Sequence, residues 1–166
     1  MIKPILLFGY GNLSRGDDAL GPLVLEYLES RVDTARIEFL TDFQLQIEHA
    51  LDLQGRELVI FIDASVTGDS AFDFTRLQPC RDNSYSSHAM SPAALLQVFE
   101  TVTGATPPPS FLLGIKAESF ELGEGLSASA AQHLQQACKF AEHLLAMPLP
   151  DIIAGDRIVA APLIDA

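Results

Sequence analysis

Short apolar runs alternate along the chain with longer segments in which apolar residues recur every three or four positions. The runs predict buried strands, and the periodic segments predict helices that connect them. The predicted strands cover residues 4–9, 36–41, 57–63, 71–77 and 110–115. Apolar and polar residues alternate in the fourth of these, which favours an edge strand. Strands and helices in alternation predict an α/β fold with crossover helices.

The helical period is found in four segments, residues 17–32, 45–53, 91–102 and 127–146. The apolar face of the first consists of Leu20, Leu23, Val24, Tyr27 and Leu28. Pro22 also lies in this segment, and proline is compatible with a helix only near its start. The inner face of the third is predicted to consist of Leu95, Val98, Phe99 and Val102. Ser91 and Pro92 predict where that helix starts, because serine caps helices and proline suits the first helical position.

The regular pattern weakens after residue 147. Pro148, Pro150 and Pro162 are expected to interrupt any regular element in this stretch. We therefore expect one domain over residues 1–147, with no internal repeat, and a C-terminal tail over residues 148–166. The tail is either an ordered appendage or a mobile end.

Composition narrows the class of protein. The chain has 166 residues, is 48% hydrophobic and carries a formal net charge of -12. Such a charge repels phosphate and argues against nucleic acid as a partner, whereas it suits a basic or cation-carrying partner or simply keeps the protein soluble. No apolar run is long enough for a bilayer, and the start does not read as a signal peptide, so we expect a soluble cytoplasmic protein. The cysteines, Cys80 in a loop and Cys138 on an apolar helix face, predict neither a disulfide framework nor a Cys-x-x-Cys metal site.

A glycine-rich stretch follows the first predicted strand and reads Gly9-Tyr-Gly-Asn-Leu-Ser-Arg-Gly-Asp-Asp-Ala-Leu-Gly21. It does not fit the dinucleotide-binding pattern, because Ser14 occupies the place of the third glycine. Asp17 and Asp18 would also repel a phosphate at the start of the following helix. These carboxylates favour a cation, or they only complement the helix dipole.

Asp63 and His88 are two further candidates for metal ligands. Asp63 ends a predicted buried strand, where α/β folds place their sites, although it also suits a turn or helix cap. His88 precedes the helix that begins after Ser91, whereas His49, His133 and His143 lie in predicted helices and are interpreted as structural. Asp18, Asp63 and His88 together would form a mixed oxygen and nitrogen site that suits nickel or zinc and leaves a position open for a substrate ligand.

Familiar protease signatures are missing from the sequence. It contains neither a Gly-x-Ser-x-Gly elbow nor a His-Glu-x-x-His helix. Ser87 and His88 are adjacent, but adjacency is not the geometry of a catalytic triad. The residues alone therefore indicate an α/β domain with a metal site.

Four segments resemble the hydrogenase maturation proteases in order and spacing. They are the glycine-rich stretch that ends at Gly21, Phe-Ile-Asp-Ala at 61–64, Ser-His-Ala-Met-Ser-Pro at 87–92 and Gly-Ile-Lys-Ala-Glu-Ser-Phe-Glu-Leu-Gly-Glu-Gly-Leu-Ser at 114–127. The resemblance covers roughly residues 3–146. It implies a three-layer α/β/α fold of the phosphorylase/hydrolase-like kind, in which a twisted, mostly parallel sheet of about five strands lies between helices.

The resemblance also implies an activity and a set of ligands. Members of this family remove a C-terminal peptide from the large-subunit precursor of [NiFe] hydrogenases after nickel insertion. An acidic residue in the opening motif, an aspartate after the central strand and a histidine bind the metal, and these roles map to Asp18, Asp63 and His88. The nickel belongs to the substrate, so neither a resident catalytic ion nor an organic cofactor is expected, and the protein is expected to be a monomer.

The sequence departs from the family pattern in two places. Better-known members have glutamate where this chain has Asp18, so Asp17 is an alternative first ligand. Residues 41–49 replace a segment that is glycine-rich in many members, and the chain looks like the form that serves soluble, NAD-reducing hydrogenases. Gly9, Gly11 and Asn12 are expected to shape the loop that holds Asp18. Which group acts as general base is left open.

Two rival hypotheses remain. The first is a nickel-sensing or nickel-delivering accessory protein, which binds the precursor without cutting it. The second is a nucleotide-binding α/β protein, which the spacing and the charge of the opening motif disfavour.

Overall fold

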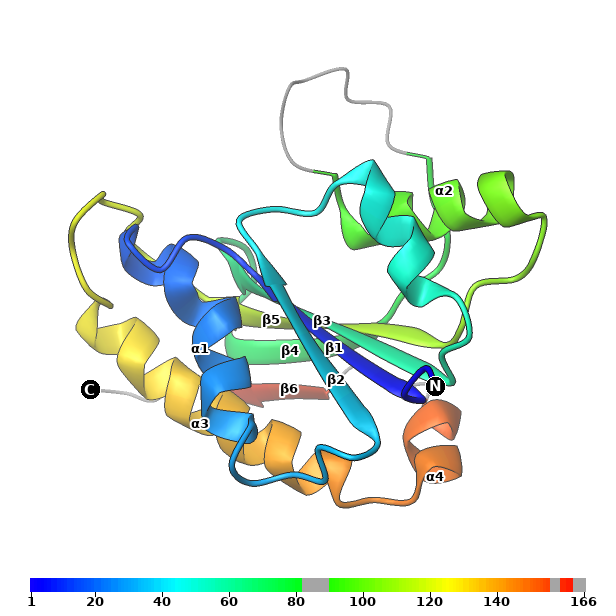
Figure 1. Ribbon diagram of the computed structural model, residues 1–166. Helices are drawn as coiled ribbons and strands as arrows, with labels where there is room; N and C mark the ends of the chain where they lie inside the picture. The colour runs from blue at the N-terminus through cyan, green and yellow to red at the C-terminus, as the bar shows by residue number, and fades with distance from the viewer. Residues whose placement is uncertain (82–89, 156–158, 163–166) are drawn as a thin grey trace.

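The computed structural model describes residues 1–81 and 90–155 in full, and residues 159–162 as backbone. A six-stranded sheet forms its centre (Figure 1). Its strands are β1 (Ile5–Tyr10), β2 (Ile37–Asp42), β3 (Leu58–Ser65), β4 (Ser70–Arg76), β5 (Ser110–Lys116) and β6 (Val159–Pro162). Their order across the sheet is β2-β1-β3-β5-β4-β6.

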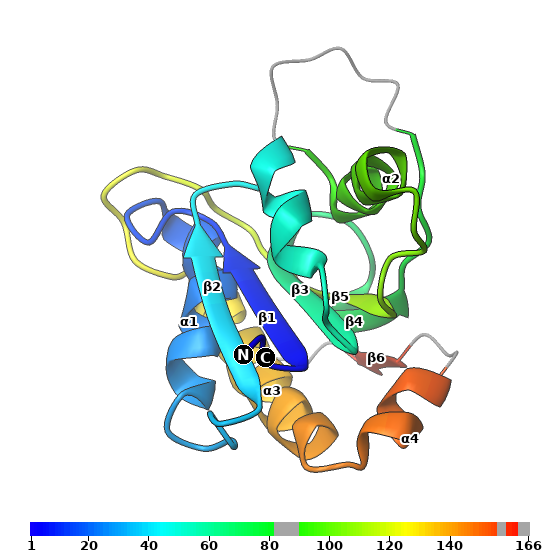
Figure 2. The ribbon, with the colours of Figure 1, turned by 45° about the vertical axis from the view of Figure 1, so that its right-hand side comes forward.

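Five of the six described strands run in one direction, and β4 runs against them. β2, β1, β3 and β5 pair in parallel, whereas β4 pairs antiparallel with both β5 and β6. The prediction of an α/β fold with a mostly parallel sheet is confirmed. The prediction that β4 lies at an edge is wrong, because β6 from the C-terminal tail pairs with its outer side. Figure 2 shows β2 and β6 at opposite margins of the sheet.

Helices cover both faces of the sheet and complete three layers. They are η1 (Gly16–Ala19), α1 (Leu20–Leu28), η2 (Ile47–Leu53), α2 (Pro92–Thr103), α3 (Ala128–Leu145) and α4 (Leu149–Ala154), where η marks a 3-10 helix. α1 and α3 pack together on one face, and α2 and η2 pack together on the other. Within the part of the chain that the structure describes, no helix is long and apolar enough to cross a membrane.

Several predicted boundaries shift for local reasons. The first predicted helix begins as the 3-10 turn η1 and ends at Leu28 rather than at residue 32, so Pro22 falls in the first turn of α1, where proline is tolerated. Ser91 caps α2 as predicted, because its hydroxyl accepts a hydrogen bond from the Ala94 amide. Val102 is 65% exposed and does not belong to the inner face of α2, where Leu96 is buried instead.

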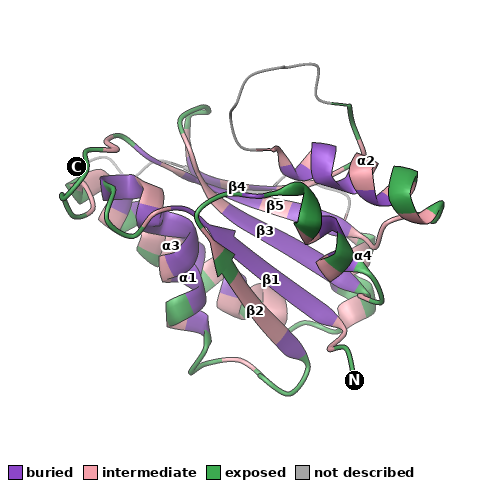
Figure 3. Ribbon diagram, turned by 45° about the horizontal axis from the view of Figure 1, so that its top comes forward, coloured by how far each residue is buried: buried purple, intermediate pink, exposed green. Residues whose placement is uncertain are grey.

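The apolar residues of the sheet divide into two clusters, one on each face. Along β1 and β3, alternate side chains point to opposite faces, and both strands are buried over most of their length (Figure 3). Leu7 and Ile60 pack on the side of α1 and α3, whereas Phe8 and Phe61 stack on the side of α2 and η2. β3 is buried from Leu58 to Ile62 and becomes partly exposed only at its carboxyl end, Asp63 to Ser65.

Two glycines bring helix α1 against this end of the sheet. A Cβ atom at Gly21 would lie 2.5 Å from the carbonyl oxygen of Ile62 and 2.8 Å from that of Tyr10. One at Gly9 would lie 2.5 Å from the carbonyl oxygen of Gly21. Real Cβ atoms do not approach this closely, so only glycine allows the chain to pass over the ends of β1 and β3. The passage sets η1 beside the end of β3.

We expect Gly21→Ala to lower the free energy of unfolding by about 3 kcal/mol, because its methyl group would push α1 away from the sheet. Urea unfolding followed by circular dichroism measures this loss. Gly125→Ala is the matched control, because a Cβ atom at Gly125 meets no atom within 4 Å. Equal stability of the two variants would contradict the close-contact argument.

Candidate functional site

The carboxyl end of β3 carries Asp63, on the sheet face that α2 and η2 cover. Asp63 follows Phe61 by two residues, and side chains two apart on a strand share a face. The parallel register pairs Gly9 of β1 with Ile62, so Tyr10 stands beside Asp63 one step further along. The predicted place of Asp63 at the carboxyl end of a buried strand is confirmed, although β3 continues for two residues beyond it.

Asp18 lies in η1, beside the same end of β3. One of its carboxylate oxygens, Oδ2, accepts a hydrogen bond of 2.8 Å from the backbone amide of Asn12. Gly11 adopts a φ of 143°, and a Cβ atom there would collide with the carbonyl oxygen of Asp18. The expected loop-shaping roles of Gly11 and Asn12 therefore have a physical basis: the loop folds tightly over Asp18 and fixes the direction of its carboxylate.

The carboxyl group of Asp63 lies in an environment that disfavours its charge. Burial is the main cause that raises the pKa of Asp63 from 3.8 to about 7, and the neighbouring negative charge of Asp18 adds to it. Hydrogen bonding from the Ala64 amide, at 2.7 Å, and from the Tyr10 hydroxyl acts in the opposite direction. A cation between Asp18 and Asp63 would relieve the repulsion, so the arrangement favours a positive ligand.

Asp17 has a different role from its neighbour, because it is completely buried. Its carboxylate accepts four hydrogen bonds, from the amides of Glu118, Ser119 and Ser127 and from the Ser127 hydroxyl, at 2.7–3.0 Å. Burial alone would raise the pKa of Asp17, but these hydrogen bonds outweigh it and hold the pKa below its ordinary value. Asp17 is thus committed to the protein, and Asp18 is the carboxylate of this pair that remains available to a ligand.

The loop between β5 and α3 is tied to the opening motif by further hydrogen bonds. The Gly16 amide donates to the carbonyl of Glu124, and the Gly123 amide donates to the carbonyl of Ser14. The side chains of Glu118, Glu121 and Glu124 are exposed on this loop. These three acidic residues therefore face solvent, while the backbone between them holds the opening motif in place.

His88, the third predicted ligand, lies outside the described residues, as do Tyr85 and Ser87. Within residues 1–81 and 90–155, no three His, Cys, Asp or Glu side chains are arranged to hold a metal ion. Asp18 and Asp63 are the two predicted ligands that the structure brings together.

The histidines interpreted as structural make contacts between elements. His49 of η2 packs edge-on against Phe8, and its Nε2 lies 3.2 Å from Oδ2 of Asp42. His133 of α3 is 4% exposed, and its Nδ1 lies 2.9 Å from the carbonyl oxygen of Lys116. Both rings join a helix to the sheet.

Three residues near the site were not singled out in the sequence. Tyr10 pairs with Asp42 across β1 and β2, while Asp63 and Asp73 both pair with Gly114 of β5. Asp42, Tyr10, Asp63 and Asp73 therefore form a row across one face of the sheet. Burial raises the pKa of Asp73 as well. Strand register alone reveals this row, and the antiparallel placement of β4 beside β5 is not visible in the hydrophobic pattern.

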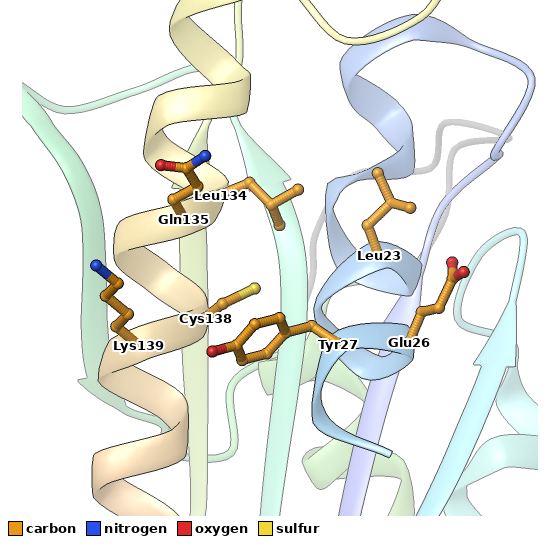
Figure 4. A pocket seen from close by; sticks show the side chains of 7 residues that line it. All are labelled: Leu23, Glu26, Tyr27, Leu134, Gln135, Cys138 and Lys139. Atoms are coloured by element: carbon orange, nitrogen blue, oxygen red, sulfur yellow. The ribbon is translucent and has the colours of Figure 1, made fainter. Parts of the chain in front are cut away.

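A hollow lies between α1 and α3, on the opposite side of the sheet from Asp63. It has a volume of about 360 Å³, and Tyr27, Leu134 and Cys138 point into the space between the helices, whereas Glu26 and Lys139 point away (Figure 4). Cys138 is 4% exposed, and burial raises the pKa of its thiol to about 11. The prediction that Cys138 belongs to the core is confirmed, and its thiol is unsuited to nucleophilic chemistry at neutral pH.

Comparison with known proteins rests on solved structures, because no protein-family model and no curated protein matches this sequence. The [NiFe] hydrogenase maturation protease HycI from Thermococcus kodakarensis matches with a TM-score of 0.67 and 24% identity, over 88% of this chain and 94% of that one. The maturating endopeptidase HybD from E. coli matches with a TM-score of 0.65 and 26% identity, over 82% and 88%. The resemblance to the hydrogenase maturation proteases is therefore confirmed.

A third solved structure matches this chain with a similar TM-score and identity. An endopeptidase from Escherichia coli, solved in solution, has a TM-score of 0.67 and 25% identity, over 94% of this chain and 96% of that one. The α/β fold implied by the sequence resemblance is the fold of these proteins. The two E. coli structures, at 26% and 25% identity, are a hydrogenase maturating endopeptidase and an endopeptidase, and they support the prediction of a peptidase.

The buried hydrogen bonds of Asp17 lead to a test of its role. Asp17→Asn would place an amide group against four donors, and we expect it to lower the free energy of unfolding by about 3 kcal/mol. Asp18→Asn is the matched control, with an expected loss below about 1 kcal/mol, because Asp18 accepts one bond at the surface. Urea unfolding compares the two, and a larger loss in Asp18→Asn would reverse the assignment.

The raised pKa of Asp63 predicts an unusual dependence of stability on pH. The folded protein keeps a proton on Asp63 that the unfolded chain has released, so the free energy of unfolding falls as pH rises from 3.8 to about 7. Asparagine carries no charge at any pH, so Asp63→Asn should be more stable than the wild type by about 4 kcal/mol at pH 8, and this gain should disappear at low pH. Chemical unfolding at both pH values measures the difference.

Asp69→Asn, at an exposed aspartate four residues after β3, is the control for the loss of a negative charge. A pH-independent difference between Asp63→Asn and the wild type would show that Asp63 does not titrate in this range.

Proposed function

We propose that this chain is an endopeptidase that removes the C-terminal peptide of a [NiFe] hydrogenase large-subunit precursor after nickel insertion. The observation that carries the proposal is the pairing of Asp18 and Asp63 at the carboxyl end of β3, in a fold shared with maturation endopeptidases. Both residues are partly buried, and the repulsion between their negative charges favours a cation. The matched structures supply the reaction class, and the carboxylate pair supplies a way to recognise its substrate.

In this proposal the nickel arrives with the precursor as part of the substrate. Asp18 and Asp63 would each offer a carboxylate oxygen, and His88 would offer an imidazole nitrogen. Such a mixed set of oxygen and nitrogen ligands suits a borderline divalent ion. The protease would then distinguish a nickel-loaded precursor from an empty one, because an empty precursor leaves the two carboxylates without a positive partner.

The protein's contribution to the chemistry would be mainly one of position. Docking of the nickel against Asp18 and Asp63 would fix the precursor relative to the sheet edge. The scissile bond would then be held in a defined position, which lowers the entropic cost of the reaction. A carboxylate that does not bind the metal would act as general base toward a water molecule. Asn12 would support the placement, because its amide holds the carboxylate of Asp18.

Mass spectrometry of a nickel-loaded precursor, incubated with and without this protein, tests the proposed activity. We expect the precursor to lose its C-terminal peptide only when both nickel and the protein are present. An unchanged C-terminus would contradict the peptidase function and would favour the rival, a nickel-sensing or nickel-delivering protein that binds without cutting. The same assay on a nickel-free precursor tests whether the metal is the signal.

The proposed ligand set predicts the effect of removing the imidazole. His88→Ala should abolish processing of the nickel-loaded precursor while the melting temperature stays within about 2 °C of the wild type, as expected for a ligand whose loss leaves the core intact. A gel-based processing assay and a thermal melt measure the two effects. His143→Ala, at the C-terminal end of α3, is the control for loss of a histidine. Full activity of His88→Ala would remove this residue from the site.

A further inference from the structure

Strand β2 forms one margin of the sheet. In the part of the chain that the structure describes, no strand pairs with its outer side, whereas β6 closes the opposite margin (Figure 2). Only Ile37 of its six residues is buried, and the other five are partly or fully exposed. An open strand of this kind offers backbone donors and acceptors to an extended peptide, which adds to the sheet as a further strand.

A pocket of about 470 Å³ opens at the carboxyl end of β2. Phe43 and Leu13 line it and are 71% and 59% exposed, while Pro22 and Leu25 of α1 contribute buried surface. Large apolar side chains that remain this exposed around a hollow indicate a surface that becomes covered when a partner binds. The volume lies within the range of pockets that hold small ligands or a few side chains.

The charge of the pocket limits what can cover it. Glu26, Glu29 and Asp42 line it, and the lining described in the structure contains no lysine or arginine. Glu26 on α1 and Glu29, the residue directly after α1, are both exposed. A lysine or arginine carried by the partner would find carboxylates at the rim, whereas an acidic partner would be repelled.

The pocket lies beside the proposed nickel-recognition site, across one short loop. Gly11 and Asn12 line the pocket, and the Gly11 amide donates a hydrogen bond of 2.9 Å to the carbonyl of Asp42. The next amide, that of Asn12, donates to the carboxylate of Asp18. One short loop therefore separates the pocket from Asp18, so a peptide seated in the pocket would extend toward the proposed site.

We propose that the outer edge of β2 and this pocket bind an extended segment of the substrate, close to its scissile bond, that carries an apolar side chain and a nearby lysine or arginine. The inference rests on the proposed function and adds to it the chemistry of the peptide that is recognised. Backbone hydrogen bonds to β2 align the segment, Phe43 and Leu13 receive the apolar side chain, and Glu26, Glu29 and Asp42 attract the positive charge.

The first test separates docking from chemistry. Phe43→Asp places a charge on the apolar wall, and it should raise KM for the nickel-loaded precursor by about tenfold while kcat stays within about twofold, because binding of the ground state and of the transition state is weakened equally. Val102→Asp, which alters an equally exposed apolar residue on α2, should leave both constants unchanged. Thermal melts of both variants confirm that they are folded. An unchanged KM in Phe43→Asp would overturn the inference.

The second test identifies what covers the pocket. A photoreactive benzoylphenylalanine in place of Phe43 should crosslink to the purified nickel-loaded precursor within the residues that flank its cleavage point, as located by mass spectrometry of the adduct. The same group in place of Val102 should give no such adduct. Adducts from position 43 that lie elsewhere in the precursor, or no adduct at all, would overturn the docking surface.

The outcomes also separate this inference from the proposed function. Cleavage by the wild type, together with an unaffected Phe43→Asp variant, would leave the peptidase function standing and refute the docking surface. A crosslink at position 43 without any cleavage would support the docking surface and refute the peptidase function, in favour of an accessory protein.

Discussion

The buried carboxylate of Asp17 is the interaction on which the geometry of the candidate site depends. It joins the opening motif, which follows β1, to the loop that follows β5, more than 100 residues later in the chain. Burying a charge is costly unless hydrogen bonds replace the lost water, and here four donors do so. One of these donors, the Ser127 hydroxyl, also caps α3, so the same contact fixes where that helix begins.

Two consecutive aspartates illustrate how position decides function. Asp17 and Asp18 have the same side chain and are adjacent in a 3-10 turn. Asp17 is nevertheless completely buried, whereas Asp18 is partly exposed. The close passage of Gly21 over β1 and β3 sets that turn at the sheet edge, and the tight loop at Gly11 orients Asp18. The hydrogen bonds of Asp17 fix the turn on which Asp18 lies, and the Asn12 amide orients the carboxylate of Asp18.

The sequence predicted the larger elements well, because buried strands and amphipathic helices leave a periodic pattern. It predicted less well where long-range contacts decide the outcome. β4 is an inner strand because β6, a four-residue strand in a proline-containing tail, pairs with its outer side. No local sequence pattern predicts such a pairing. Asp63 was predictable from its place at a strand end, but its raised pKa depends on its burial and on the nearby charge of Asp18, and only the fold produces both. The choice between Asp17 and Asp18 likewise required the loop at residues 118–127.

The strand order has a consequence for how the chain folds. β3 and β4 are neighbours in sequence, but β5 lies between them in the sheet. The chain cannot complete the sheet by adding strands in the order in which they occur, and β4 has no partner until β5, more than 30 residues later, has docked on β3. Pairings of such long range carry a high entropic cost of loop closure and slow folding. The parallel half, β2, β1 and β3, is formed from consecutive elements and offers the surface on which the later half assembles.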